Sequence, residues 1–181
     1  MKLNRIRTGL FTRAYKINNK NVLLHSVCLA KHCNAELGFG DNYLFPEIEK
    51  ITYQTFKMPF YNVGSKKGGI RNKVSARQWR LYKALRNLSV YCRNNYDLGQ
   101  AWERAFESLP SEFKNEKRYL IEALNSFRNY TCFPCFEISP RNIAIKGNKI
   151  VLLDCFFCLE QSRKVRTGKE KLASEYEFFN Q

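Results

Sequence analysis

The chain has 181 residues, of which 44% are hydrophobic and 14% are aromatic. This length and composition are sufficient to bury a sizeable core, and they exclude a disordered tail. No apolar run approaches the ~18 residues that a membrane-spanning helix needs, and the N-terminal stretch MKLNRIRTGLF lacks the apolar core of a signal peptide. We therefore expect a cytoplasmic protein, in which the 7 cysteines are reduced thiols rather than disulfides.

Positive charge is concentrated in the first half of the chain. Residues 1–96 contain 18 Lys and Arg against 4 Asp and Glu, whereas residues 97–181 contain 13 against 12. No acidic residue lies between Lys50 and Tyr96. Such a distribution favours an acidic partner, which can be a nucleic acid, an acidic protein surface or a polyphosphate. The alternative is a cationic protein that is simply soluble.

The first third of the chain predicts a β-rich lobe with one helix. Alternation over residues 5–26 predicts two strands, GLFTRAYKI and NVLLHS. A short helix is predicted over 27–37, and residues 44–62 predict two further strands, the second ending in KMPFYN. The Gly- and Lys-rich segment VGSKKGGIRNK then predicts a loop between two parts of the chain. We therefore divide the chain into an N-terminal lobe, residues 1–62, and a C-terminal lobe, residues 63–181.

The second part predicts helices and one hairpin. Ser75 is a helix N-cap residue, and the apolar residues that follow it recur at helical spacing. Two more helices are predicted over 98–108 and 114–130. The segment 136–157 predicts a hairpin of two short buried strands around the turn Gly147-Asn148, and a basic, polar tail follows it.

Three polar residues, Glu137, Asn142 and Asp154, lie at the ends of these apolar strands. Carboxylate and amide oxygens are ligands that suit Mg²⁺, and a second carboxylate can accept the proton of an attacking hydroxyl. The alternative is that the three residues only cap turns of a core hairpin.

The motif EISPRN, followed by LLD, resembles the catalytic segment of protein kinases. Kinases place a catalytic Asp, then an Asn, and a metal-binding Asp after the hairpin. The chain is also similar to small kinase-like proteins of bacteriophages, which share an LLDCFF-like continuation. The resemblance implies an α+β, minimal bilobal protein kinase-like fold, with a small β-rich N-lobe and a mainly helical C-lobe. It also implies ATP and Mg²⁺ as cofactors, and a serine/threonine kinase that acts on or sequesters a protein in the host cytoplasm.

The resemblance assigns roles to particular residues. Asn142 and Asp154 would hold Mg²⁺, and Glu137 would be the catalytic carboxylate. Two positions depart from kinases, because Glu137 replaces an Asp and Leu24 stands where the third strand carries a Lys. These departures imply a weakly active kinase or a pseudokinase. The residues implied to bind the nucleotide are Gly9, Arg13, Lys16 and Met58.

The cysteines offer a different interpretation. The pairs Cys132/Cys135 and Cys155/Cys158 have the spacing of a zinc ribbon. Phenylalanines surround the four thiols, however, whereas zinc knuckles usually contain Gly and polar residues. Buried structural thiols are therefore the favoured interpretation, and zinc is the alternative.

A cluster of cations in the middle of the chain predicts a partner-binding surface. The cluster lies on the loop after residue 62 and on the outer face of the following helix. Such close like charges repel one another, which favours a polyanionic partner. We expect an acidic host protein, with nucleic acid as the alternative and no membrane. The residues are Lys66, Lys67, Arg71, Lys73, Arg77, Arg80 and Lys83.

Overall fold

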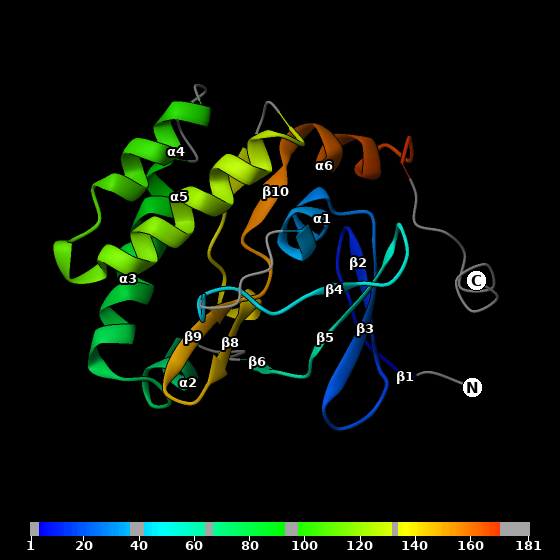
Figure 1. Ribbon diagram of the computed structural model, residues 1–181, viewed down its shortest axis with the longest axis horizontal. Helices are drawn as coiled ribbons and strands as arrows, with labels where there is room; N and C mark the ends of the chain where they lie inside the picture. Colours follow the sequence, from blue (N-terminus) through cyan, green and yellow to red (C-terminus); the bar gives the residue numbers. More distant parts are fainter. Residues whose placement is uncertain (1–3, 37–41, 64–66, 93–97, 132–133, 171–181) are drawn as a thin grey trace.

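The computed structural model describes the chain except residues 1–3, 37–41, 64–66, 93–97, 132–133 and 171–181. Figure 1 shows a β-sheet with one helix on one side of the molecule and helices on the other, with short strands between them. In the part of the chain that is described, no helix is both long enough and apolar enough to cross a membrane.

A five-stranded antiparallel sheet with the order β1-β2-β3-β5-β4 forms the N-terminal lobe (Figure 1). Alternation explains the central strand, because Val22 and Leu24 point to the same face and both are buried. The sequence predicted two strands before residue 26, but the structure has three, because the chain turns at Gly9, whose amide donates to Thr12 O at 2.8 Å. The strands are β1 (Asn4–Thr8), β2 (Thr12–Lys16), β3 (Asn21–Ser26), β4 (Glu49–Lys50) and β5 (Thr55–Pro59).

The helix α1 (Leu29–Glu36) joins this sheet to the rest of the protein. It contacts α5 (Lys114–Arg128), β4 and β10 (Phe156–Cys158). Its apolar residues Ala30 and Cys33 are buried in the main core. The predicted helix is therefore confirmed, two residues shorter at its start.

The chain passes from one lobe to the other after β5. Its next strand, β6 (Asn62–Val63), pairs with β8 (Ile143–Lys146) in a second sheet with the order β6-β8-β9. β9 (Lys149–Leu152) completes the predicted hairpin, and Gly147 provides the turn with a φ of 63°, a conformation that favours glycine. A two-stranded sheet, β7 (Pro134–Phe136) with β10, flanks the hairpin.

Helices make up most of the C-terminal lobe. Ser75 caps the helix that follows it, because its Oγ accepts from Gln78 N at 3.2 Å. Part of the segment predicted as a loop is instead helical, and Ile70 is fully buried there against the neighbouring helix. The helices are α2 (Lys67–Arg71), α3 (Ala76–Cys92), α4 (Leu98–Glu107), α5 and α6 (Leu159–Arg166), with short 3-10 turns at Ser111–Phe113 and Pro140–Asn142.

One large apolar core holds the helical lobe to α1 and to the strands beside it. Aromatic rings at its centre pack edge to face, as with Phe106 and Phe136, whose centroids lie 5.0 Å apart.

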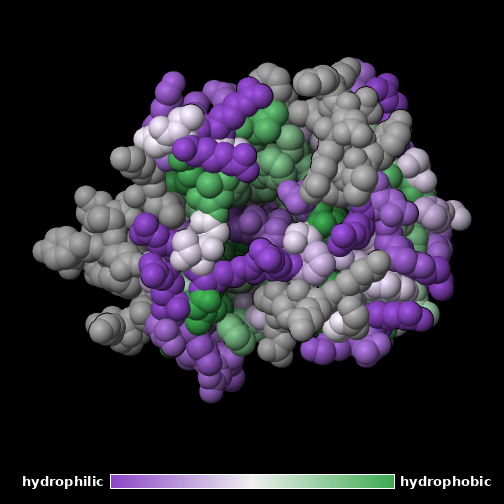
Figure 2. Space-filling model, turned by 180° about the vertical axis from the view of Figure 1, so that it is seen from behind, coloured by the Kyte–Doolittle hydropathy of each residue, from purple (hydrophilic) through white to green (hydrophobic). Residues whose placement is uncertain are grey.

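The outer surface is different: Figure 2 shows mainly hydrophilic residues, with hydrophobic residues gathered in a few patches and a hollow near the middle of the view. The α+β class, with a β-rich first lobe and a mainly helical second lobe, is thus confirmed.

Candidate functional site

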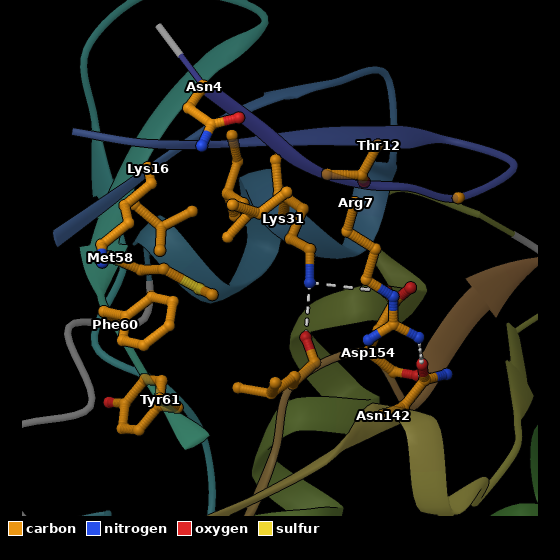
Figure 3. Close-up of a pocket in the computed structure, with 16 residues that line it drawn as sticks. Asn4, Arg7, Thr12, Lys16, Lys31, Met58, Phe60, Tyr61, Asn142 and Asp154 are labelled. Atoms are coloured by element: carbon orange, nitrogen blue, oxygen red, sulfur yellow. Dashed lines mark hydrogen bonds and ion pairs between the residues drawn. The ribbon is translucent and has the colours of Figure 1, made fainter. Parts of the chain in front are cut away.

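A cavity of about 650 Å³ lies where the first sheet meets α1 and the β8–β9 hairpin (Figure 3). The sheet provides the apolar wall, in which Val22, Leu24 and Met58 are inward-facing side chains. The opposite end is polar and charged. The residues that line the cavity are Asn4, Ile6, Arg7, Gly9, Thr12, Ala14, Lys16, Val22, Leu24, Lys31, Met58, Phe60, Tyr61, Asn142, Leu153 and Asp154.

Lys31 brings a buried positive charge to this cavity. It lies on α1, and only 4% of its surface is exposed. Its Nζ donates to Leu153 O at 2.5 Å and lies 3.4 Å from Asp154 Oδ1 (Figure 3). A lysine is rarely buried to this degree without partners, so these contacts are needed to hold the ammonium group there.

Lys31 was not predicted from the sequence. The resemblance to kinases implied a lysine on β3, where Leu24 forms part of the apolar wall instead. One signal could have found it, because Lys31 follows Val27 by four residues and Cys28 by three. A lysine on the buried face of a predicted helix is unusual enough to mark a candidate site.

Asn142 and Asp154 come together as the sequence predicted. Asn142 ends the 3-10 turn before β8, and Asp154 follows β9, so the hairpin brings them to the same end of the cavity. Asn142 Nδ2 donates to Asp154 O at 2.9 Å, and Leu153 N donates to Asn142 O at 2.9 Å. These backbone contacts hold the two side chains beside one another.

Arg7 reaches the same end of the cavity from the edge strand β1. Its Nη1 donates to Arg141 O at 2.6 Å, and its Nη2 lies 3.4 Å from Asn142 Oδ1. Figure 3 shows the guanidinium group beside Asn142, opposite the end of Lys31. Arg7 therefore connects the first lobe to the turn before β8 across the mouth of the cavity.

The side-chain oxygens of the two residues that the sequence assigned to Mg²⁺ face side-chain cations in this arrangement. Mg²⁺ requires near-ideal octahedral geometry with oxygen ligands at about 2.0–2.1 Å. Here the ammonium group of Lys31 faces the Asp154 carboxylate, and the guanidinium group of Arg7 faces the amide oxygen of Asn142. Any Mg²⁺ ion bound there would have to share these two oxygens with the two cations.

Of the residues predicted to bind the nucleotide, three line the cavity and one does not. Gly9, Lys16 and Met58 line the cavity. Arg13 does not, because neighbouring residues of a strand point to opposite faces and Thr12 and Ala14 are the ones that face inward. The assignment of Arg13 to the nucleotide therefore does not match its position.

Glu137 is not one of the residues that line the cavity. It is half-buried just after β7, and its backbone amide donates to Cys155 O at 2.8 Å. The five-residue spacing to Asn142 is the same as in kinases, but the carboxylate does not reach the wall of the cavity. Its catalytic role stays a prediction.

Three of the four cysteines considered for zinc, Cys135, Cys155 and Cys158, are described by the structure; they are buried and form no disulfide. Burial raises the pKa of Cys135 to about 11, and burial with the nearby charge of Asp154 raises the pKa of Cys155 still further. Among the described residues, no group of three or more His, Cys, Asp or Glu could hold a metal ion; Cys132, one of the four proposed ligands, lies outside them.

The predicted partner-binding surface is partly neutralised within the chain. Arg77 Nη1 bonds to Glu116 Oε1 at 2.5 Å, and Arg80 Nη2 bonds to Glu112 Oε2 at 2.7 Å. The sequence analysis missed these acids because they lie more than 30 residues further along the chain, on α5 and the turn before it. Arg71, Lys73 and Lys83 are exposed, whereas Lys66 and the side chain of Lys67 lie outside what the structure describes.

Together, the β-sheet lobe with one helix, the helical lobe and the hairpin bearing Asn142 and Asp154 form the predicted bilobal, protein kinase-like arrangement. The cavity lies between the two lobes, because its lining residues come from both.

Solved structures that are similar to this chain include the following two. The streptomycin–ATP–APH(2'')-IIa ternary complex has 14% sequence identity and a TM-score of 0.42, over 87% of this chain and 67% of the other. The ADP-bound crystal structure of aminoglycoside phosphotransferase APH(2'')-Ib has 12% identity and a TM-score of 0.40, over the same shares. No family model and no curated protein matches the chain. Similarity at this level does not transfer an activity or a substrate.

Proposed function

We propose that the protein binds a nucleotide, with ATP as the first candidate, in the cavity between its two lobes. The observation that carries the proposal is the division of the cavity into an apolar end and a cationic end. Val22, Leu24 and Met58 offer flat apolar surface to a base, and Lys31 and Arg7 offer positive charge to phosphates. Most ligand sites are apolar clefts with a few polar groups of this kind, and 650 Å³ is large enough for a nucleotide.

Thermal unfolding with and without ATP tests this proposal. A ligand at a hundred times its dissociation constant stabilises the folded state by about 2.7 kcal/mol, which for a chain of this size is a rise of about 5–11 °C in Tm. Lys83→Met is a matched control, because Lys83 is an exposed lysine on α3, outside the cavity. The control should respond to ATP as the wild type does. No shift with any nucleotide at millimolar concentration would overturn the proposal.

We further propose that phosphoryl transfer is slow or absent, so that the protein is a weakly active kinase or a pseudokinase directed at a host protein. The position of Glu137 outside the lining residues supports this, because a catalytic base must come within hydrogen-bond reach of the attacking hydroxyl. Radiolabelled ATP, with the protein itself and a generic serine/threonine substrate, measures the rate. Rapid autophosphorylation that is lost in Glu137→Ala would contradict the proposal.

A second candidate function is docking of an acidic partner on the surface of α2 and α3. The exposed cations Arg71, Lys73 and Lys83 support it, since the Arg77 and Arg80 charges are already compensated. Binding should weaken as salt rises, and an Arg71→Glu/Lys73→Glu/Lys83→Glu variant should lose it without a lower melting temperature. Tight binding of generic nucleic acid at physiological salt would favour the nucleic-acid alternative.

A further inference from the structure

We infer that the cavity binds the phosphates of its nucleotide through Lys31 and Arg7, without a divalent cation. This inference rests on the proposed nucleotide binding and specifies the form of the ligand, the metal-free nucleotide. It also replaces the Mg²⁺ that the sequence assigned to Asn142 and Asp154.

Lys31 has the properties of a fixed phosphate ligand. Its side chain is 95% buried, and the contacts with Leu153 O and Asp154 Oδ1 use two of the three hydrogen atoms on its ammonium group. The group also lines the cavity, so its remaining direction is toward the ligand. Because α1 packs against α5 and β10, the lysine is held in position before the ligand arrives.

Arg7 provides a second cation on the opposite side of the same end. Its guanidinium group has five N–H donors in a planar fork, and the contacts with Arg141 O and Asn142 Oδ1 use only part of them. Arginine suits this role because its fork can bind two phosphate oxygens at once. Figure 3 shows the charged ends of Arg7 and Lys31 near one another, close to Asp154.

The end of the cavity proposed for the phosphates is already cationic. Arg7 and Lys31 lie there with one carboxylate, Asp154, for a net charge of +1. Lys16, the third cation of the lining, lies at the apolar end, with its Nζ 5.3 Å from the centroid of the Phe60 ring (Figure 3). A metal ion bound to Asp154 would also lie within a few ångströms of the Lys31 ammonium group, and this close repulsion would disfavour it.

Calorimetric titration of the full chain with ATP, in EDTA and in excess Mg²⁺, tests the inference. We expect ATP to bind in EDTA at least as tightly as in Mg²⁺. Lys31→Met should weaken binding in EDTA by about tenfold or more, because a hydrogen bond from a charged donor is lost. Arg7→Gln, a change at an exposed site that should not affect folding, should weaken it similarly. Lys20→Met, an exposed lysine outside the cavity, is the matched control and should bind like the wild type.

Asp154→Asn distinguishes binding of the phosphates by side chains alone from binding through Mg²⁺. If side chains alone hold the phosphates, removing this carboxylate removes a repulsion, and ATP should bind more tightly in EDTA. The amide oxygen can still accept the contact from Lys31. If binding instead requires Mg²⁺ and is lost in Asp154→Asn, the inference is overturned while the proposed nucleotide binding stands. If the wild type binds no nucleotide under either condition, both are overturned.

Discussion

Two ion pairs in this protein have the same charges but opposite arrangements. In the pair of Arg77 with Glu116, the buried partner is the acid: the Glu116 side chain is 1% exposed and that of Arg77 is 39% exposed. In the pair of Lys31 with Asp154, the buried partner is the base: the Lys31 side chain is 5% exposed and that of Asp154 is 41% exposed. The first pair lies inside the helical lobe and the second at the cavity.

The number of hydrogen bonds also separates them. Both oxygens of Glu116 accept from Arg77, at 2.5 Å and 2.8 Å, and the hydroxyl of Tyr43 donates to Glu116 as well. Lys31 has one backbone acceptor and a 3.4 Å contact with a solvated carboxylate. The Arg77–Glu116 pair joins α3 to α5, and both oxygens of its buried carboxylate already accept hydrogen bonds. The Lys31–Asp154 pair instead leaves the Lys31 ammonium group able to bind a ligand. The difference indicates that burial of an ion pair alone does not mark a functional site; incomplete bonding beside a cavity does.

The largest expected effect comes from breaking the first pair. Arg77→Met leaves the buried Glu116 carboxylate without its main partner, which should lower the free energy of unfolding by about 3 kcal/mol. This value is at the low end of the usual range because Arg77 is 39% exposed and water can replace part of the interaction. Urea unfolding monitored by circular dichroism measures it. A change near zero would show that Glu116 is solvated or protonated in the folded protein.

Breaking the second pair should affect the ligand rather than the fold. Lys31→Met replaces a buried ammonium group by an apolar side chain of similar length, and the Asp154 left behind is solvated, so unfolding without ligand should change little. The stabilisation by saturating ATP, about 2.7 kcal/mol at a hundred times the dissociation constant, should largely disappear. Thermal unfolding with and without ATP measures both. If Lys31→Met greatly lowered the stability but left ATP binding intact, the Lys31–Asp154 pair would be a structural ion pair and not part of a ligand site.

The pH dependence of unfolding should follow Glu116. Burial acts to raise the pKa of Glu116, but hydrogen bonds from Arg77 and Tyr43 outweigh it and hold this pKa below its usual 4.5. Because the pKa is lower in the folded state, the pair contributes stability above about pH 4.5 and loses it as the pH falls through the folded-state value. Urea midpoints of the wild type and Glu116→Gln, measured from about pH 6 to pH 3, should show a steeper fall in the wild type. Equal slopes would mean that Glu116 does not titrate as described.

The smallest effect is expected at the exposed neighbour of the first pair. Arg80 bonds to Glu112 at 2.7 Å, but the two side chains are 53% and 37% exposed, so water can solvate both after either is removed. Arg80→Met should unfold almost as the wild type does in the same urea experiment. It is therefore the matched control for Arg77→Met, one turn away on α3. A loss as large as that of Arg77→Met would mean that the four charges act as one network.

Local patterns predicted much of the fold correctly. The alternation of NVLLHS, the Ser75 cap and the Gly147-Asn148 turn each appear as expected in the structure. Elements whose form depends on packing were missed. The segment around Ile70 was predicted as a loop because of its glycines, yet it is helical where Ile70 packs against α3.

The residues of the candidate site show the same contrast between features that depend on local sequence and features that depend on packing. Asn142 and Asp154 could be predicted from the sequence because a short hairpin joins them, and residues that flank a hairpin must come close together. The buried face of its helix could mark Lys31 as a candidate, but the partners of Lys31 and Arg7 could not be predicted, since Leu153, Asp154 and Arg141 lie more than 120 residues further along the chain. The sequence by itself therefore determined the strands, the helix starts and the polar ends of the hairpin, all of which depend on neighbours within a few residues. Only the packing of α1 and the reach of the Arg7 side chain from β1 decided which cations face those polar groups, because no local periodicity specifies contacts across such a separation.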